Sequence, residues 1–170
     1  MKRLTLLLLL LAAAVHTVAA QGDASALLKK IEGKRVSFDY SLNTADKISV
    51  KHSGSALIEG KCYRIVDNGM EIWCDGVTRW TVDKEAKEVY IEDPGEEADM
   101  LLSPSRLLSN VKDLVAGSST ASGKYTGEGP GKGSTFVLTS IKTYEPKGVS
   151  NEFVYDISSL GAPWVITDLR

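Results

Sequence analysis

Two cysteines, Cys62 and Cys74, are the side chains of this sequence with the widest range of chemistry. They flank the turn sequence Asp-Asn-Gly at residues 67–69, so they lie on the two strands of a predicted hairpin. If all three residues form the loop, Cys62 faces Cys74 across the strands, within the range of a disulfide. If only Asn68 and Gly69 turn, Cys62 faces Asp75 and the two thiols point to opposite faces.

We favour the three-residue loop and predict a disulfide between the two cysteines. The register that this loop sets places both cysteines on one face of the hairpin, together with the apolar residues Val66, Met70 and Ile72. The export signal described below also indicates an oxidising compartment. The alternatives are two buried thiols, and a metal or redox pair. Two sulfurs alone make a poor zinc site, and the sequence has no C-x-x-C motif.

Other candidate catalytic residues have simpler interpretations. His52 is the single histidine beyond the apolar N-terminal segment, and its polar, alternating surroundings predict a solvent-facing strand residue. Residues 127–135 (GEGPGKGST) resemble a phosphate loop, but a glycine follows Lys132 where the motif needs Ser or Thr, and a strand follows. The acidic residues within 96–99 have no aromatic platform nearby and predict a solvated loop. We therefore expect no enzyme, no metal and no cofactor.

The N-terminus has the pattern of an export signal. Lys2 and Arg3 precede an apolar run at residues 4–15, and small residues at 18–20 form a cleavage site, so we expect a mature chain of residues 21–170. The apolar run is shorter than the ~20 residues of a membrane-spanning helix. We expect a soluble, single-domain, monomeric protein outside the cytoplasm. Without Lys2 and Arg3, 18 basic residues stand against 22 acidic ones, which argues against nucleic acid as the main partner.

The hydrophobic pattern predicts a mainly β fold. Residues 23–31 form an amphipathic helix, and residues 103–115 (SPSRLLSNVKDLV) have the spacing of a second one. Alternating segments predict strands at 36–42, 48–52, 55–59, 61–66, 70–74, 79–83, 88–92, 123–126, 135–142, 152–157 and 164–169. The turns are short, so we expect a curved antiparallel half-barrel of about nine or ten strands. The two helices would cover its concave face, the second as a lid.

A ligand cavity is the functional site that this pattern suggests, because two helices are a thin cover for so large a sheet. The alternative is an ordinary packed core, as in a structural interaction module. The predicted lining consists of alternating strand residues and two leucines of the second helix: Phe38, Tyr40, Leu57, Ile72, Trp80, Val82, Val89, Ile91, Leu107, Leu108, Phe136, Leu138, Phe153 and Tyr155.

Several segments, in order along the chain, resemble the outer-membrane lipoprotein carrier (LolA-like) family. Residues 75–83 (DGVTRWTVD), followed by Val89, are similar to its "SDGKTLWxYDP…QV" segment, and residues 54–64 (GSALIEGKCYR) to its "GxLxxKxPxxFR" strand. Residues 103–108 (SPSRLL) resemble its "xPxxLL" helix. Residues 153–156 (FVYD) and 164–170 (WVITDLR) resemble its last strands.

The resemblance implies a half-barrel with a helical lid and a periplasmic chaperone without enzymatic activity. Such a carrier takes acylated lipoproteins from an inner-membrane ABC transporter, shields their acyl chains and delivers them to an outer-membrane receptor. Envelope regulators that sense lipid or lipoprotein share this fold and are the alternative. The family's Arg-Pro pair, whose arginine latches the lid, is replaced here by Gly60 and Lys61, so the resemblance implies a latch that is absent or rebuilt.

Overall fold

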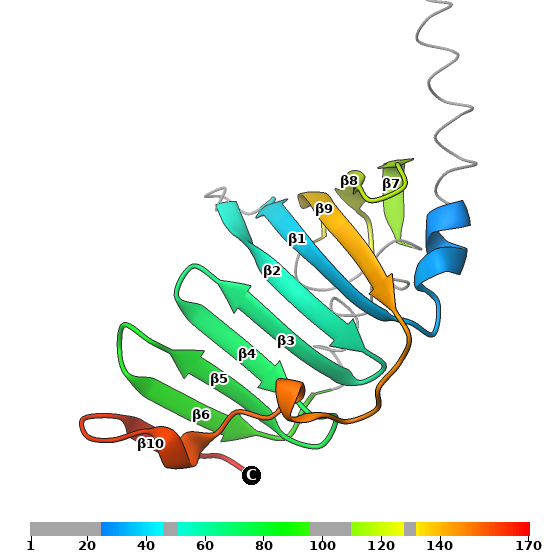
Figure 1. The fold of residues 1–170 in the computed structure, drawn as a ribbon. Helices are drawn as coiled ribbons and strands as arrows, with labels where there is room; N and C mark the ends of the chain where they lie inside the picture. The colour runs from blue at the N-terminus through cyan, green and yellow to red at the C-terminus, as the bar shows by residue number, and fades with distance from the viewer. Residues whose placement is uncertain (1–24, 46–50, 96–109, 128–131) are drawn as a thin grey trace, which may run out of the picture.

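The computed structural model describes residues 25–45, 51–95, 110–127 and 132–170. These residues form one ten-stranded sheet with the strand order β10-β6-β5-β4-β3-β2-β1-β9-β8-β7, which is open because β10 and β7 are its two edges (Figure 1). The strands are β1 (Arg35–Asn43), β2 (Lys51–Glu59), β3 (Cys62–Asp67), β4 (Met70–Cys74), β5 (Arg79–Asp83), β6 (Glu88–Glu92), β7 (Val111–Ala116), β8 (Ala121–Tyr125), β9 (Thr135–Tyr144) and β10 (Val165–Asp168).

The connections are mostly tight hairpins, as predicted. Strands β1 to β6 form an antiparallel meander. Strand β9 then pairs with the free side of β1, so residues 135–144 lie beside residues 35–43 (Figure 1). The last strand, β10, pairs parallel to β6, so the sheet is mixed and the prediction of a wholly antiparallel sheet is wrong at this edge. Residues 145–164 carry the chain from the end of β9 to the start of β10 at the far edge of the sheet. We call residues 145–164 the strap.

Three predicted elements differ in the structure. Residues 51–59 form one strand through Gly54, where two strands were expected. The expected strand at 152–157 is replaced by two short 3-10 helices, η1 (Asn151–Phe153) and η2 (Ile157–Ser159). Residues 111–115 belong to strand β7, so the predicted second helix is wrong there, while its residues 103–109 lie outside the described chain.

A bulge explains the false helical signal in β7. The register of β7 against β8 shifts between Lys112 and Val115, and Asp113 has a φ of 54°. One extra residue in a strand brings side chains three positions apart onto the same face. Val111 and Leu114 therefore pack on one apolar cluster, with the spacing that a helix would also give.

The first helix is confirmed over residues 25–31, and it defines the two faces of the sheet. On the helix-side face, Leu27 and Ile31 join a buried cluster with apolar residues of β1, β7, β8 and β9. On the opposite, strap-side face, the strap covers a second cluster on β5 and β6, formed by Trp80, Val82, Val89 and Ile91. The orange strap crosses the near side of the sheet in Figure 1.

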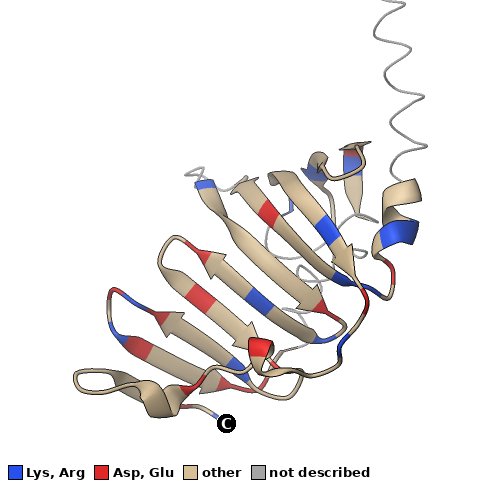
Figure 2. Cartoon of the chain, viewed as in Figure 1, with Lys and Arg blue, Asp and Glu red and all other residues tan. Residues whose placement is uncertain are grey.

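The apolar side of the sheet changes face between β4 and β5. On the helix-side face, Ile72 of β4 is opposite Thr81 of β5, so the apolar row ends there. On the strap-side face, Trp73 is opposite Trp80, and the apolar surface begins. Each half of the sheet thus buries a different face. Charges of both signs are scattered over the strands (Figure 2).

Candidate functional site

The predicted cavity residues divide between the two faces of the sheet. Five lie on the helix-side face: Phe38, Tyr40, Ile72, Phe136 and Leu138. Six belong to the core between strap and sheet: Trp80, Val82, Val89, Ile91, Phe153 and Tyr155. Leu57 lies on the strap-side face, and Leu107 and Leu108 lie outside the described residues. The predicted residues therefore do not line one continuous cavity. The alternation of a strand shows which residues share a face, but it does not show which face is covered by other parts of the protein.

The remaining candidate is an apolar surface on the helix-side face. Neighbouring strands place seven side chains side by side there, and we call these the helix-side apolar surface: Phe38, Tyr40, Leu42, Ile65, Ile72, Phe136 and Leu138. Four of them are only half-buried, namely Phe38, Tyr40, Leu42 and Ile72. Large half-buried apolar side chains on adjacent strands can bind an apolar ligand, because the ligand removes their exposed apolar surface from water.

Polar residues border this surface on β5 and β6. Arg79 is ion-paired with Glu92, and Thr81 lies between Ile72 and Tyr90 in the same row. The Tyr90 hydroxyl donates a hydrogen bond of 2.6 Å to Glu88, and this bond raises the pKa of Tyr90 above its usual value. The apolar surface therefore has a defined end at β4.

A polar cluster adjoins the apolar surface at a second place, on β1, β2 and β3. His52 is opposite Leu42, and Gly54 lies between Tyr40 and Asp67 in the next row. The His52 Nδ1 atom is 3.1 Å from Asp67 Oδ2. Burial and the negative charge of Asp67 raise the pKa of Tyr40 above its usual range, so its hydroxyl stays protonated.

Gly54 is required for this arrangement. A Cβ atom at this position would stand 1.8 Å from the Val66 carbonyl oxygen and 3.1 Å from the Tyr40 hydroxyl. The first distance involves backbone that cannot turn aside, so only glycine lets the Tyr40 side chain lie across β2 toward Asp67. The sequence carried this signal, since an isolated glycine within a strand indicates a close approach, but the predicted strand break at this position hid it.

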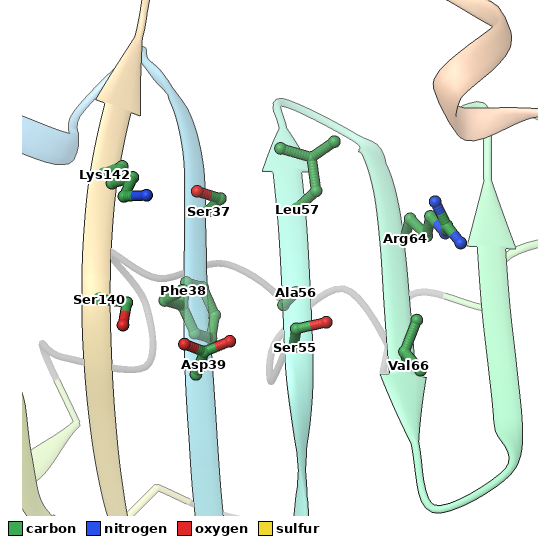
Figure 3. A pocket seen from close by; sticks show the side chains of 10 residues that line it. All are labelled: Ser37, Phe38, Asp39, Ser55, Ala56, Leu57, Arg64, Val66, Ser140 and Lys142. Carbon is green, nitrogen blue, oxygen red and sulfur yellow. The ribbon is translucent and has the colours of Figure 1, made fainter.

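The opposite, strap-side face has a shallow groove over β9, β1, β2 and β3, with a volume of about 360 Å³ (Figure 3). Its lining is mixed: Ser37, Phe38, Asp39, Ser55, Ala56, Leu57, Arg64, Val66, Ser140 and Lys142. The Arg64 guanidinium lies 4.0 Å from the centre of the Trp73 ring and 3.6 Å from Glu71. Two predicted cavity residues, Phe38 and Leu57, line this groove, but serines, Asp39 and an arginine already in contact with Glu71 line it too, so it is less uniformly apolar than the helix-side apolar surface.

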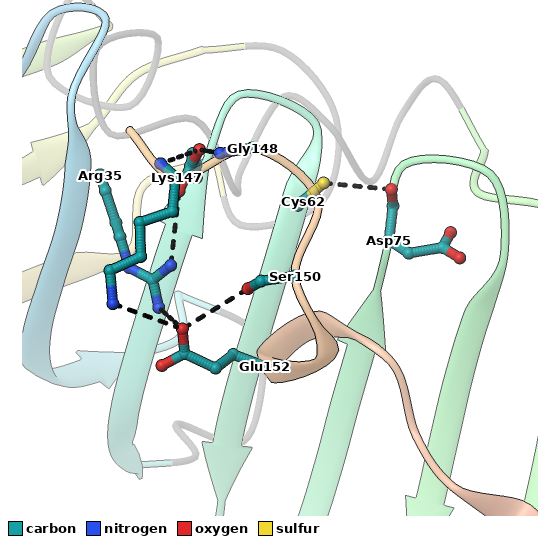
Figure 4. A network of polar contacts seen from close by, with 8 residues as sticks. Arg35, Cys62, Asp75, Lys147, Gly148, Ser150 and Glu152 are labelled. Atoms are coloured by element: carbon teal, nitrogen blue, oxygen red, sulfur yellow. Dashed lines mark hydrogen bonds and ion pairs between the residues drawn. The ribbon is translucent and has the colours of Figure 1, made fainter. Parts of the chain in front are cut away.

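A buried polar network holds the strap to the sheet (Figure 4). Arg35 is 3% exposed, and its guanidinium pairs with Glu59 at 3.5 Å and with Glu152 of η1 at 2.7 Å. Glu59 Oε1 also accepts hydrogen bonds from the backbone nitrogens of Lys147 and Gly148, at 2.8 and 2.5 Å. Sequence reasoning missed this network, although a charged residue beside the apolar start of β1 was a possible signal.

The cysteines are two buried thiols with no disulfide between them. The hairpin turns at Asn68 and Gly69 alone, with Tyr63 opposite Cys74, so the favoured register is wrong and the two-residue turn is correct. Cys62 Sγ donates to the Asp75 carbonyl at 3.1 Å, and Cys74 Sγ to the Lys61 carbonyl at 3.7 Å. Each thiol thus donates to the backbone carbonyl of the residue next to the other cysteine, and these two bonds link β3 and β4 at the end of the hairpin away from the turn.

Within the described ranges, no group of three or more His, Cys, Asp or Glu side chains is arranged to hold a metal ion. None of the helices in that part of the chain is long and apolar enough to span a membrane. The chain matches no protein-family model, and no curated protein is similar enough to it to count as a relative. The helix-side apolar surface and its polar borders therefore stand as the candidate site on their geometry alone.

Proposed function

We propose that this protein is an acyl-chain carrier of the bacterial periplasm, of the lipoprotein-carrier type that its sequence segments resemble. In this proposal it accepts an acylated protein from an inner-membrane ABC transporter, shields the acyl chains and passes them to an outer-membrane receptor. No bond is made or broken, so no catalytic residue is needed.

The observation that most supports the proposal is the helix-side apolar surface on an open sheet. A free acyl chain exposes methylene groups to water at a cost of ~0.8 kcal/mol each, which a loose aliphatic and aromatic surface can offset. Half-buried Phe38, Leu42 and Ile72 provide such a surface without the interlocked packing of a closed core. Loose packing suits a ligand that must later be released.

Two leucines on opposite faces of the sheet test the proposal. Leu42 belongs to the helix-side apolar surface and Leu57 to the strap-side groove, and both are half-buried. The mature chain, purified without detergent from cells with an outer membrane, is analysed for bound acyl species by mass spectrometry. We expect Leu42→Glu to reduce the bound acyl species by about tenfold or more, because it places a charge against the acyl chain.

The matched Leu57→Glu variant should keep its acyl ligand, with both variants showing the circular dichroism spectrum of the wild type. Wild-type protein that carries no acyl species in any such preparation would overturn the proposal. Equal loss of ligand in both folded variants would move the site away from the helix-side face.

A further inference from the structure

The two edges of the sheet differ in how they oppose pairing with a further strand. An edge strand exposes unpaired N–H and C=O groups, and proteins block such edges with bulges and charged side chains. Strand β7 has both, because its ladder is interrupted by a bulge and Lys112 and Asp113 are exposed. Strand β10, at the other edge in Figure 1, pairs with β6 in an unbroken register. The β10 edge is therefore the one that can accept a further strand.

The backbone hydrogen bonds of β10 show which of its groups point away from the sheet. The amide nitrogens of Val165 and Leu169 donate to carbonyls on the β6 side, at 2.9 and 2.8 Å. The backbone groups of a strand alternate between its two sides, so the N–H and C=O groups of Ile166 and Asp168 point outward. In the described part of the chain, no strand lies on that side.

The side chains along this edge are mostly apolar. Val165, Ile166 and Leu169 are 55%, 45% and 60% exposed. Asp168 is the charge that would oppose pairing, but its carboxylate accepts hydrogen bonds from the backbone nitrogen and the guanidinium of Arg170, at 3.1 and 2.7 Å. A partner strand would thus cover apolar surface and pair the outward backbone groups without meeting an unpaired charge.

We propose that β10 pairs antiparallel with β10 of a second copy of this chain, about a two-fold axis at Thr167. The edge is self-complementary in this register. Ile166 of each copy lies opposite Asp168 of the other, so the outward N–H and C=O groups of both residues are paired. On the helix-side face, Val165 of each copy is opposite Leu169 of the other, and the two Thr167 side chains meet at the axis.

The neighbouring registers satisfy fewer groups. A two-fold axis at Asp168 would place the two Asp168 carboxylates opposite each other, and like charges in that position are destabilising. An axis at Ile166 would place Asp168 opposite Trp164, whose amide nitrogen already donates to the Gly161 carbonyl at 3.2 Å, so the Asp168 carbonyl would find no donor. Because one register of the edge with itself is complementary, we name a second copy, and not a strand of another protein, as the partner.

The dimer has a defined geometry. A two-fold axis between antiparallel strands is perpendicular to the sheet, so the helix-side apolar surfaces of both copies lie on the same side of the dimer. The strand is short, and interfaces under ~1,200 Å² are weak, so we expect a reversible equilibrium between dimer and monomer. This inference is independent of the proposed function, and it differs from the monomer that the sequence led us to expect.

Sedimentation equilibrium of residues 21–170 measures the association. The weight-average mass of the wild type should rise from that of one chain at about 10 µM toward that of two chains at about 1 mM, the range of a weak interface. Ile166→Pro removes an outward N–H but no hydrogen bond to β6. It should raise the dissociation constant of the dimer by about tenfold or more, with the circular dichroism spectrum of the wild type.

Charge substitutions at exposed side chains test the register with a second set of variants. Val165→Lys places an ammonium group against Leu169 of the second copy and should weaken the dimer by about tenfold or more. Adding Leu169→Glu puts a carboxylate opposite that lysine, so the double variant should recover the dissociation constant of the wild type to within about threefold. Val77→Lys, at a 74% exposed valine in the turn between β4 and β5, is the control and should leave the dimer unchanged.

A wild type that stays monomeric at about 1 mM overturns the proposal. If the wild type dimerises, and folded Ile166→Pro and Val165→Lys dimerise equally well, the interface lies elsewhere and the proposal is wrong. If both single variants weaken the dimer and the double variant does not recover it, β10 does not pair in the proposed register.

Discussion

The buried pair of Arg35 and Glu59 should contribute more to stability than the shorter, more exposed contact of Arg35 with Glu152. The Arg35 side chain is 4% exposed and that of Glu59 is 10% exposed, whereas that of Glu152 is 52% exposed. At an effective dielectric constant of ~20, charges 3.5 Å apart attract by about 5 kcal/mol. Water screens the 2.7 Å contact with the more exposed Glu152, so this contact should be the weaker one despite its shorter distance.

The substitution Glu59→Gln isolates the charge. It keeps an oxygen to accept from the Lys147 and Gly148 nitrogens, but it turns an amide toward Arg35. The change removes the attraction between the two charges, but it also removes the cost of desolvating the Glu59 carboxylate. The second effect offsets part of the first, so we expect a net destabilisation of about 2–3 kcal/mol. The matched Glu152→Gln should cost clearly less stability than Glu59→Gln, because water screens an exposed ion pair.

Urea denaturation of residues 21–170, followed by tryptophan fluorescence, measures both effects as shifts in midpoint at unchanged slope. Because Trp73, Trp80 and Trp164 all pack in the strap cluster, their fluorescence reports release of the strap directly. If Glu59→Gln stays within about 0.5 kcal/mol of the wild type, or if Glu152→Gln is the costlier variant, burial does not decide the strength of this network.

Three further predictions concern single positions. Gly54→Ala should destabilise the fold by about 2 kcal/mol or more, because its Cβ would meet backbone, while the neighbouring Ser55→Ala should cost under about 0.5 kcal/mol in the same assay. Burial favours a higher pKa for Glu71, but hydrogen bonds from a lysine and a tryptophan and two nearby positive charges leave the pKa below its usual value. Stability from Glu71 is therefore present above its unfolded pKa, about 4.3, and lost as pH falls through the lower folded value, so Glu71→Gln should flatten the loss of stability below about pH 4.5. Cys62 and Cys74 should both react with a thiol reagent after denaturation without reductant and resist it in the native state, since both are buried; a count of zero thiols would show a closed disulfide.

The sequence predicted most strands but not the register that decides which residues meet. Strands β4, β5 and β6 have the predicted bounds, because their alternation is regular and their turns are short. The hairpin between β3 and β4 was misjudged, since the three-residue loop collected more apolar residues on one face. The structure uses Asn68 and Gly69 with φ of 42° and 93°, the two positive values that this turn type needs.

A slip of one residue moves every side chain of a strand to the other face, so this error carried into the predicted site. Val66 lies on the strap-side face, opposite Glu71, while Ile65 and Ile72 face the helix side. The candidate cluster depends on the same register, because it places Asp67 in line with Gly54 and Tyr40. The geometry of the turn at Asn68 and Gly69 therefore determines which side chains meet at the candidate site. The number of apolar residues that a register places on one face of a single hairpin does not predict this.

The change of apolar face between β4 and β5 has a consequence for a protein proposed to carry acyl chains. A carrier must stay folded when it is empty, so its stability cannot depend on the surface that the ligand covers. Here the strap fills the strap-side face of β5 and β6 with the protein's own side chains, and Val82 and Val89 there are fully buried. The half-buried side chains Phe38 and Leu42 lie on the other face, at the other half of the sheet. This division is partial, because Phe38 and Leu42 also pack against the buried cluster under the first helix, so in this proposal the empty carrier would depend mainly on its strap-side core.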